Sequence, residues 1–346
     1  MIGNSNRHIY LGGYDVSRYV ISTKVPTAQQ NKPEWGELPA ITNLEFDLIN
    51  DKGYFSSRGF QSIFNNVDLT IIPAKVTLEQ GSTVLVEWEG FIQQIVEDYR
   101  SNRATVTGIT RFSKLLDTPA LLTLGANTPS ELSRLVFGLF NIPIDETAYA
   151  RANSLLSGLV QAQIDPNLLD SHLTLMELQK QLAAAGYGRI YSNNGLMVYE
   201  VFQESLSPAV SFEIGERQIM DHPVISKETR ESTPYTVQTL GIGQATSANW
   251  YSGSNSKNLD FGPSAAVKVT SLSAGQQIAD QWELIDKINT IRIEFPVMDN
   301  IGAMLDLTSY ISFTWDKIGL QSEVMEIIGI DRSDNRYTKL VGRVAT

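Results

Sequence analysis

Asp98-Tyr99-Arg100-Ser101-Asn102-Arg103-Ala104-Thr105 and Asp331-Arg332-Ser333-Asp334-Asn335-Arg336-Tyr337-Thr338 share the pattern D-x-x-x-N-R-x-T. In each copy one apolar stretch precedes the motif and another follows it. Asp, Asn and Ser side chains bond local backbone at hairpin corners, so convergent turn chemistry explains the match equally well. If the repeat is genuine, the chain holds two copies of one β module. Such a duplication indicates a structural component of an assembly rather than an enzyme.

The length and composition indicate a soluble protein of several domains. The chain has 346 residues, which is enough for two or three domains with separate cores. No apolar stretch approaches the roughly 18–20 residues that span a bilayer. The first residues also lack the apolar region of a secretory signal. We therefore expect a soluble protein that is made in a cytosol.

Cysteine content and charge exclude several classes of site. The chain contains no cysteine, which removes disulfides, thiolate nucleophiles and cysteine-based metal centres. The net charge is −11, and the 27 Lys and Arg residues are scattered. The densest group, at 100–114, has the spacing of a solvated strand face. Because nucleic-acid binders usually carry a basic patch, we do not expect specific DNA binding.

The range 1–118 is predicted to be a first β-barrel module. Leu44, Phe46 and Leu48 alternate with Glu45 and Asp47, which is the period of a half-buried strand. A similar alternation covers 84–88, and turn-forming residues separate the apolar runs.

The range 119–204 is predicted to be a small α+β insert. Thr128-Pro129-Ser130-Glu131 is a helix-start signal, and an apolar stripe at helical spacing follows it. A second helix is expected over 146–156, and a third from Thr174 to Gly186. Asn194-Gly195 then predicts a tight β-hairpin over 189–199.

The range 205–346 is predicted to be a second β-barrel module with one helix at about 275–289. The helix rests on an apolar stripe, and 247–263 is expected to be a loop. Strands are expected at 211–214, 235–240, 291–295, 310–315, 324–330 and 338–344. The predicted fold class is mainly β (α+β overall), with two tube-like β-barrel modules and a small α+β insert between them.

A search for reaction chemistry leads to the prediction that the chain has no catalytic residue, no cofactor site and no metal site. His8, His172 and His222 have no partner at metal-ligand spacing. Gly241-Ile242-Gly243 follows a strand but precedes loop sequence, whereas a dinucleotide site needs a helix there. Residues 47–53 lack the ligand spacing of a calcium loop and favour a hairpin turn.

Two alternatives stay open at this stage. A pair of catalytic carboxylates is defined by spatial and not sequential spacing, so 38 acidic residues leave a cell-wall hydrolase conceivable. Trp250-Tyr251, in the Ser- and Asn-rich stretch, is the aromatic pair that could bind carbohydrate. Trp88, Trp282 and Trp315 lie on apolar faces and are expected in the core.

Three early segments resemble the N-terminal module of phage tail hub and minor tail proteins. They are Tyr14-Asp15-Val16-Ser17-Arg18-Tyr19-Val20, 43–50 followed by Gly53-Tyr54-Phe55-Ser56, and Trp88-Glu89-Gly90-Phe91-Ile92. The helix from Thr174 with its Asn-Gly hairpin is similar to the α+β insert of that family. The segments 278–288 and 291–296 and the final hairpin are similar to its C-terminal module. Where the family often has Gly-Asp, this chain has Leu307-Thr308.

The resemblance implies a homotrimeric hub in a tailed phage or a phage-derived injection machine, located in the virion at the tail tip or baseplate. Two barrels per chain would give a pseudo-sixfold ring that continues the hexameric tail tube and lines the DNA channel. The implied partners are the tail tube protein, the tail-tip spike, other baseplate proteins and the tape measure protein. DNA would pass through without specific binding, and the chain would not insert into a membrane. The alternatives are a carbohydrate-binding or adhesion module at the tail tip and, with less support, a cell-wall hydrolase.

Overall fold

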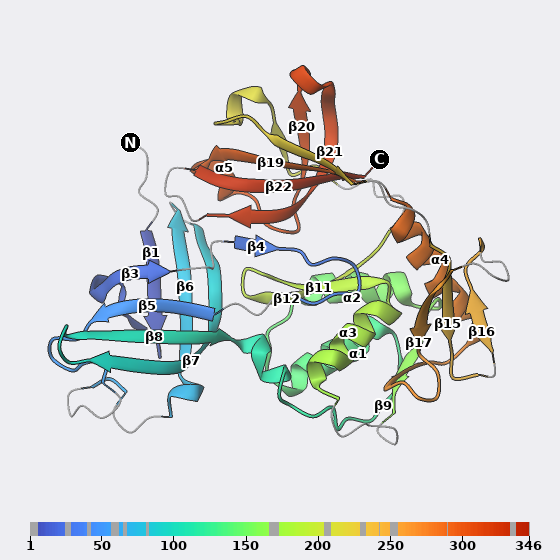
Figure 1. Ribbon diagram of the computed structural model, residues 1–346, viewed down its shortest axis with the longest axis horizontal. Helices are drawn as coiled ribbons and strands as arrows, with labels where there is room; N and C mark the ends of the chain where they lie inside the picture. The colour runs from blue at the N-terminus through green and yellow to red at the C-terminus, as the bar shows by residue number, and fades with distance from the viewer. Residues whose placement is uncertain are drawn as a thin grey trace.

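The protein is built from two curled β-sheets and an α+β unit, the middle unit in chain order, which lies beside both sheets (Figure 1). The structure, a computed structural model, describes residues 6–24, 29–39, 43–56, 62–64, 68–80, 83–165, 173–203, 209–228, 233–241, 243–249, 255–288, 290–332 and 337–345. It is mainly β, as the sequence predicted, and each sheet is barrel-like. In Figure 1 the first sheet is blue to teal, the part of the middle unit before residue 204 is green, and the second sheet is yellow to red with one blue strand from the N-terminal part.

The first sheet has seven strands in the order β2-β1-β6-β7-β8-β5-β3. Leu44, Phe46 and Leu48 of β5 are buried and their neighbours are not, which confirms the predicted alternation. These side chains and the apolar residues of the other strands form one core. The strands are β1 (Asn6–Leu11), β2 (Tyr14–Asp15), β3 (Val20–Lys24), β5 (Asn43–Ile49), β6 (Pro73–Gln80), β7 (Thr83–Asp98) and β8 (Arg103–Thr110).

The second sheet has the order β13-β20-β21-β22-β19-β14, and β4 from the N-terminal part of the chain also pairs with β21. Its core consists of the inward side chains of β19, β20, β21 and β22, together with Tyr191, Val198 and Ile214. The strands are β4 (Gln29–Asn31), β13 (Phe212–Ile214), β14 (Val224–Glu228), β19 (Thr290–Met298), β20 (Tyr310–Trp315), β21 (Leu320–Asp331) and β22 (Tyr337–Ala345).

The two sheets repeat one arrangement of six strands. Taken in chain order, β1, β3, β5, β6, β7 and β8 occupy the places of β13, β14, β19, β20, β21 and β22. The long strand of each sheet has two bulges at matching places, around Glu87 and Gln93 in β7 and around Ser322 and Ile328 in β21. Bulges re-aim and twist a strand, so this agreement extends to local geometry. One strand differs: β1 runs antiparallel to β6, whereas β13 runs parallel to β20.

The sequence motif that suggested the repeat is out of register with the structural repeat. Asp98 pairs with Arg103, whereas Asp331 pairs with Lys339. Thr105 is half-buried beside the buried Ala104, but Thr338 is itself fully buried. A shift by one residue exchanges the two faces of a strand, so these threonines are not equivalent. The structurally equivalent positions are instead Phe46 with Phe295 and Gly108 with Gly342. Residues 333–336 of the second motif lie outside the described residues.

The middle unit contains the three predicted helices and the predicted hairpin. The Thr128 side chain accepts a hydrogen bond from the Glu131 amide, and Thr174 and Glu177 form a reciprocal capping box. The elements are β9 (Leu124–Asn127), α1 (Pro129–Leu139), α2 (Glu146–Leu156), β10 (Ala162–Ile164), α3 (Leu175–Ala185), β11 (Gly188–Asn193) and β12 (Leu196–Val201).

Part of the range 205–346 packs in the core of the middle unit instead of the second sheet. β18 pairs with β10, and Tyr235, Ala245, Trp282 and Ile285 belong to the same core as α1 and α3. The predicted helix is α4, and the predicted loop at 247–263 contains a strand, β17, because parallel pairing with β15 overrides its polar composition. These elements are β15 (Tyr235–Gln238), β16 (Gln244–Thr246), β17 (Lys257–Asp260), β18 (Val267–Val269) and α4 (Leu272–Lys287); a short α5 (Asp299–Gly302) follows β19.

Candidate functional site: a buried ion network between the units

One segment of the N-terminal part connects the second sheet to the middle unit. This strap, residues 29–39, begins as β4, in which Asn31 pairs with Gly329 of β21. Its next amide, that of Lys32, donates to the carbonyl of Ile328 (2.8 Å). Further along, the Gly36 amide donates to the Gly188 carbonyl at the start of β11 (2.6 Å). The strap therefore bridges two units of the fold.

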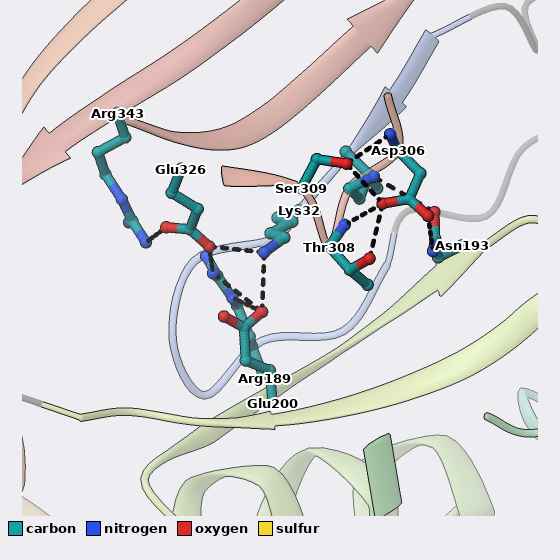
Figure 2. A network of polar contacts seen from close by, with 10 residues as sticks. Lys32, Arg189, Asn193, Glu200, Asp306, Thr308, Ser309, Glu326 and Arg343 are labelled. Atoms are coloured by element: carbon teal, nitrogen blue, oxygen red, sulfur yellow. Dashed lines mark hydrogen bonds and ion pairs between the residues drawn. The ribbon is translucent and has the colours of Figure 1, made fainter. Parts of the chain in front are cut away.

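Five charged side chains meet under the strap (Figure 2). Lys32 Nζ lies 3.0 Å from Glu200 Oε2 and 2.6 Å from Glu326 Oε1. Arg189 also bonds both carboxylates, with its Nη2 atom 3.1 Å from Glu200 Oε2. Arg343 Nη2 lies 2.6 Å from Glu326 Oε2. The strap, the hairpin β11–β12 and the strands β21 and β22 each supply at least one member of this network.

Aromatic rings shield the two central cations. The guanidinium of Arg189 lies 4.1 Å from the ring centroid of Trp35, and Lys32 Nζ lies 4.9 Å from that of Tyr191. Only 1% of each cationic side chain is exposed. The strap turns at Gly36, where φ is +76° and an added Cβ would lie 2.6 Å from Trp282 of α4. Glycine is therefore required both by the backbone conformation and by the close approach.

The cations keep both carboxyl groups ionised. Burial alone would raise the pKa of Glu326, but Arg189, Lys32 and Arg343 hold that pKa well below its usual value. For Glu200 burial acts in the same direction, and Arg189 and Lys32 again lower the pKa. Burial would lower the pKa of Arg189, yet the two carboxylates raise it. Removing Glu200 or Glu326 would leave the buried cations short of negative charge, and removing Lys32 would take from both carboxylates a cation that they share.

A second polar contact ties the tip of the hairpin to the second sheet (Figure 2). Asp306 accepts hydrogen bonds from the amide (2.8 Å) and the hydroxyl (2.6 Å) of Thr308 and from Asn193 Nδ2 (3.3 Å). Burial would raise the pKa of Asp306, but these bonds from Thr308 and Asn193 lower it. This turn is the corner where Leu307-Thr308 departs from the family pattern, and Asp306 fixes its geometry.

A cleft of about 250 Å³ lies beside the network. Lys32 and Glu200 contribute to its wall, and α2 and β20 supply Arg151 and Tyr310. Both network residues are already engaged in ion pairs, and Asp145, also in the wall, caps α2 by accepting a hydrogen bond from the Ala148 amide (3.0 Å). Among the described residues, no group of three or more His, Cys, Asp or Glu side chains is placed to hold a metal ion. The arrangement is suited to holding the strap, the middle unit and the second sheet together.

His8 and His222 lie apart from this network. His8 Nδ1 lies 3.0 Å from Asp15 Oδ2 at the edge of the first sheet. The ring of His222 packs edge-on against Trp315, with 6.3 Å between centroids. His172 lies outside the described residues.

The other candidate segments also have simple structural roles. Gly241 and Gly243 lie in the connection between the antiparallel strands β15 and β16, so the turn interpretation is confirmed. The turn after Asp47 is not a hairpin turn, because β5 pairs with β8 and β3 and not with the next strand. Trp88, Trp282 and Trp315 are buried as predicted. Trp250 and Tyr251 lie outside the described residues.

Sequence reasoning missed the ion network, although one signal was available. The Asn194-Gly195 turn fixes the register of its hairpin, and that register places Arg189 directly opposite Glu200. Opposite charges that face each other on a strand pair whose other residues are mostly apolar indicate a buried pair. Nothing local connects Lys32 or Glu326 to them, because these residues meet through long-range packing.

Searches for related proteins give structural matches alone. No protein-family model matches the chain, and no curated protein sequence matches it. The fold is similar to that of a tail protein from Neisseria meningitidis MC58, with a TM-score of 0.57, 12% identity, and coverage of 99% of this chain and 97% of the other. It is also similar to the 43 kDa tail protein of prophage MuSo2 from Shewanella oneidensis, with a TM-score of 0.53, 15% identity and 98% coverage of both. The chain thus has the fold of these phage tail proteins over its full length.

Proposed function

We propose that this protein is a structural hub of a phage tail or a phage-derived injection machine. The observation that carries the proposal is the presence of two sheets with one strand order in a single chain. The full-length likeness to two phage tail proteins supports the same conclusion. In this proposal the two ring-forming units come from the ranges 1–118 and 205–346, and the range 119–204 with the elements packed on it is the insert between them.

Three copies of the chain form a pseudo-sixfold ring in this proposal. Two equivalent sheets per chain supply six modules, which matches a hexameric tail tube to a threefold tail tip. Both sheets have strands at their edges that need partners: all five residues of β14 are exposed, and β14 pairs only with β19 among the described strands. Open edges promote aggregation unless they are covered, and closed cyclic assembly covers them.

The ring binds the tail tube protein on one side and the spike and other baseplate proteins on the other, and the tape measure protein contacts it during assembly. The net charge of −11 supports a channel wall that repels DNA, since DNA is itself strongly negative. The role is structural and involves no catalytic site, and it places the chain in the virion at the tail tip. Among the described residues, no helix has both the length and the apolar character needed to cross a membrane.

Mass measurement of the purified chain and imaging of assembled particles test this proposal. We expect three copies per ring, with the two sheets alternating around a channel. Each subunit contact should exceed the roughly 1,600 Å² of a standard interface, because permanent interfaces are larger. A ring with six copies, or a particle with a single copy, would contradict the proposal. Release of sugar or amines from purified cell wall, lost when one acidic residue is replaced, would show an enzyme instead.

A further inference from the structure

The two sheets of one chain contact each other through two different surfaces, one on each sheet. Arg7 of β1 donates from Nε to Glu87 Oε2 (2.6 Å) and from Nη2 to the backbone carbonyl of Arg332 (3.1 Å). Glu87 lies in β7, and its side chain is 1% exposed. Arg332 follows β21 directly, at the base of the β21–β22 connection. The hairpin end of the second sheet therefore meets the β1–β7 side of the first sheet.

The matching surfaces at the opposite ends of the two sheets are open. The hairpin end of the first sheet, at the β7–β8 turn, exposes 50% of Val96 and 78% of Tyr99. The side of the second sheet that corresponds to Glu87 is the start of β21. There Ser322 is exposed at the place of Glu87, and Val324 is 43% exposed. One chain thus carries a free hairpin end on one sheet and a free receiving side on the other.

We propose that the β7–β8 hairpin end of one copy packs against the start of β21 in a second copy of the chain. The contact repeats, between chains, the geometry by which the β21–β22 end meets the first sheet within a chain. This inference rests on the proposed hub function. A repeated contact between two different patches forms a ring when its rotation closes after a whole number of steps. In this proposal the contact within a chain and the contact between chains relate neighbouring sheets by the same rotation.

The chemistry of the two contacts differs. Within the chain the contact is ionic, because Glu87 receives Arg7. Between chains Ser322 replaces the carboxylate, and the exposed apolar side chains are those of Tyr99, Val96 and Val324, with Asp98 and Arg100 exposed beside Tyr99. Tyrosine is enriched at protein interfaces since it offers apolar area with a polar end.

Cysteine cross-linking tests the inference directly, because the chain contains no cysteine. The test variant carries Tyr99→Cys and Ser322→Cys, and it is treated with a short bismaleimide at a concentration where mass measurement detects the oligomer. We expect a ladder on a denaturing gel that ends at a covalent trimer. The control variant carries Tyr99→Cys and Leu121→Cys; Leu121 is 73% exposed in the middle unit and should give no ladder.

The outcomes separate this inference from the hub proposal. A trimer by mass without the 99–322 ladder overturns the contact and leaves the hub function standing. A monomer by mass and by gel, together with imaged particles that lack a threefold ring, overturns both. Tyr99→Asp adds a measurement that does not depend on cross-linking: we expect trimer dissociation at an at least tenfold higher protein concentration, with unchanged circular dichroism. An unchanged dissociation concentration would contradict the inference.

Discussion

The first and second sheets have the same strand order around separate cores, but they differ along one edge. In the second sheet, β4 pairs with β21 at Gly329–Asp331, just beyond the bulge. At the matching stretch of β7, around Gln94–Val96, the described residues include no strand on that side. The interior pattern thus sets the strand order in both sheets, whereas the edges have diverged. The difference teaches that the strap locks one sheet to the middle unit, whereas the matching stretch of the other sheet has no such strand among the described residues.

The strongest test of the equivalence of the two sheets replaces the phenylalanines at matching positions of their separate cores. Phe46→Ala and Phe295→Ala should each destabilise their own sheet by about 3–5 kcal/mol, because each leaves a large cavity. The cost should be about 1 kcal/mol greater for Phe295, whose ring lies 4.9 Å from that of Phe313, where the first sheet has Val76. Hydrogen exchange resolved by peptide would measure each sheet separately.

The control for this comparison is Leu121→Ala, which removes an exposed side chain of the middle unit and should leave exchange in both cores unchanged. Equal loss of protection in both sheets from either single variant would contradict the separation of the two cores.

A test of the edge difference removes the cation of the strap. Lys32→Met should lower protection in β21 and β12 by about 3 kcal/mol and leave β7 unchanged, since Glu200 and Glu326 would lose a shared counter-charge. Lys180→Met is the matched control, because Lys180 pairs with Glu37 of the same strap at an exposed site. That variant should cost less than about 1 kcal/mol. Comparable effects of the two variants would show that the buried network does not lock the strap.

Acidification should give the smallest difference in stability between the two sheets. The pKa of Glu326 lies well below its ordinary value of 4.5, and the pKa of Glu200 is lowered as well. A lowered folded-state pKa contributes stability that is present above the unfolded value and is lost as the pH falls through the folded value. We expect the second sheet to loosen before the first as the pH falls below the ordinary glutamate pKa of 4.5.

Urea unfolding followed by tryptophan emission would measure the acid effect, with Glu326→Gln as the comparison. That variant should start less stable near neutral pH and should lose less stability on acidification. A wild-type chain and variant with parallel pH profiles would show that Glu326 does not carry the acid response.

The local parts of the fold were predictable from sequence, and the long-range parts were not. Thr128 and Thr174 fixed helix starts, and Asn194-Gly195 fixed a hairpin, because each acts through neighbouring backbone. The duplication was inferred from a motif that proved out of register, since turn residues recur for local reasons. The packing of 235–285 on the middle unit and the meeting of Lys32 with Glu326 depend on contacts that no local pattern encodes.

The equivalent connections β3–β5 and β14–β19 both leave their sheet and pack on the middle unit, where Gly36 of the first approaches Trp282 of the second. One spans residues 25–42 and the other 229–289, yet the strands on either side keep the same neighbours. Because the closure entropy of a connection grows slowly with its length, this point of the fold tolerates large insertions. It is therefore the position at which descendants of a duplicated gene could acquire new segments without redesigning the sheets, and it is a rational graft site for an engineered domain.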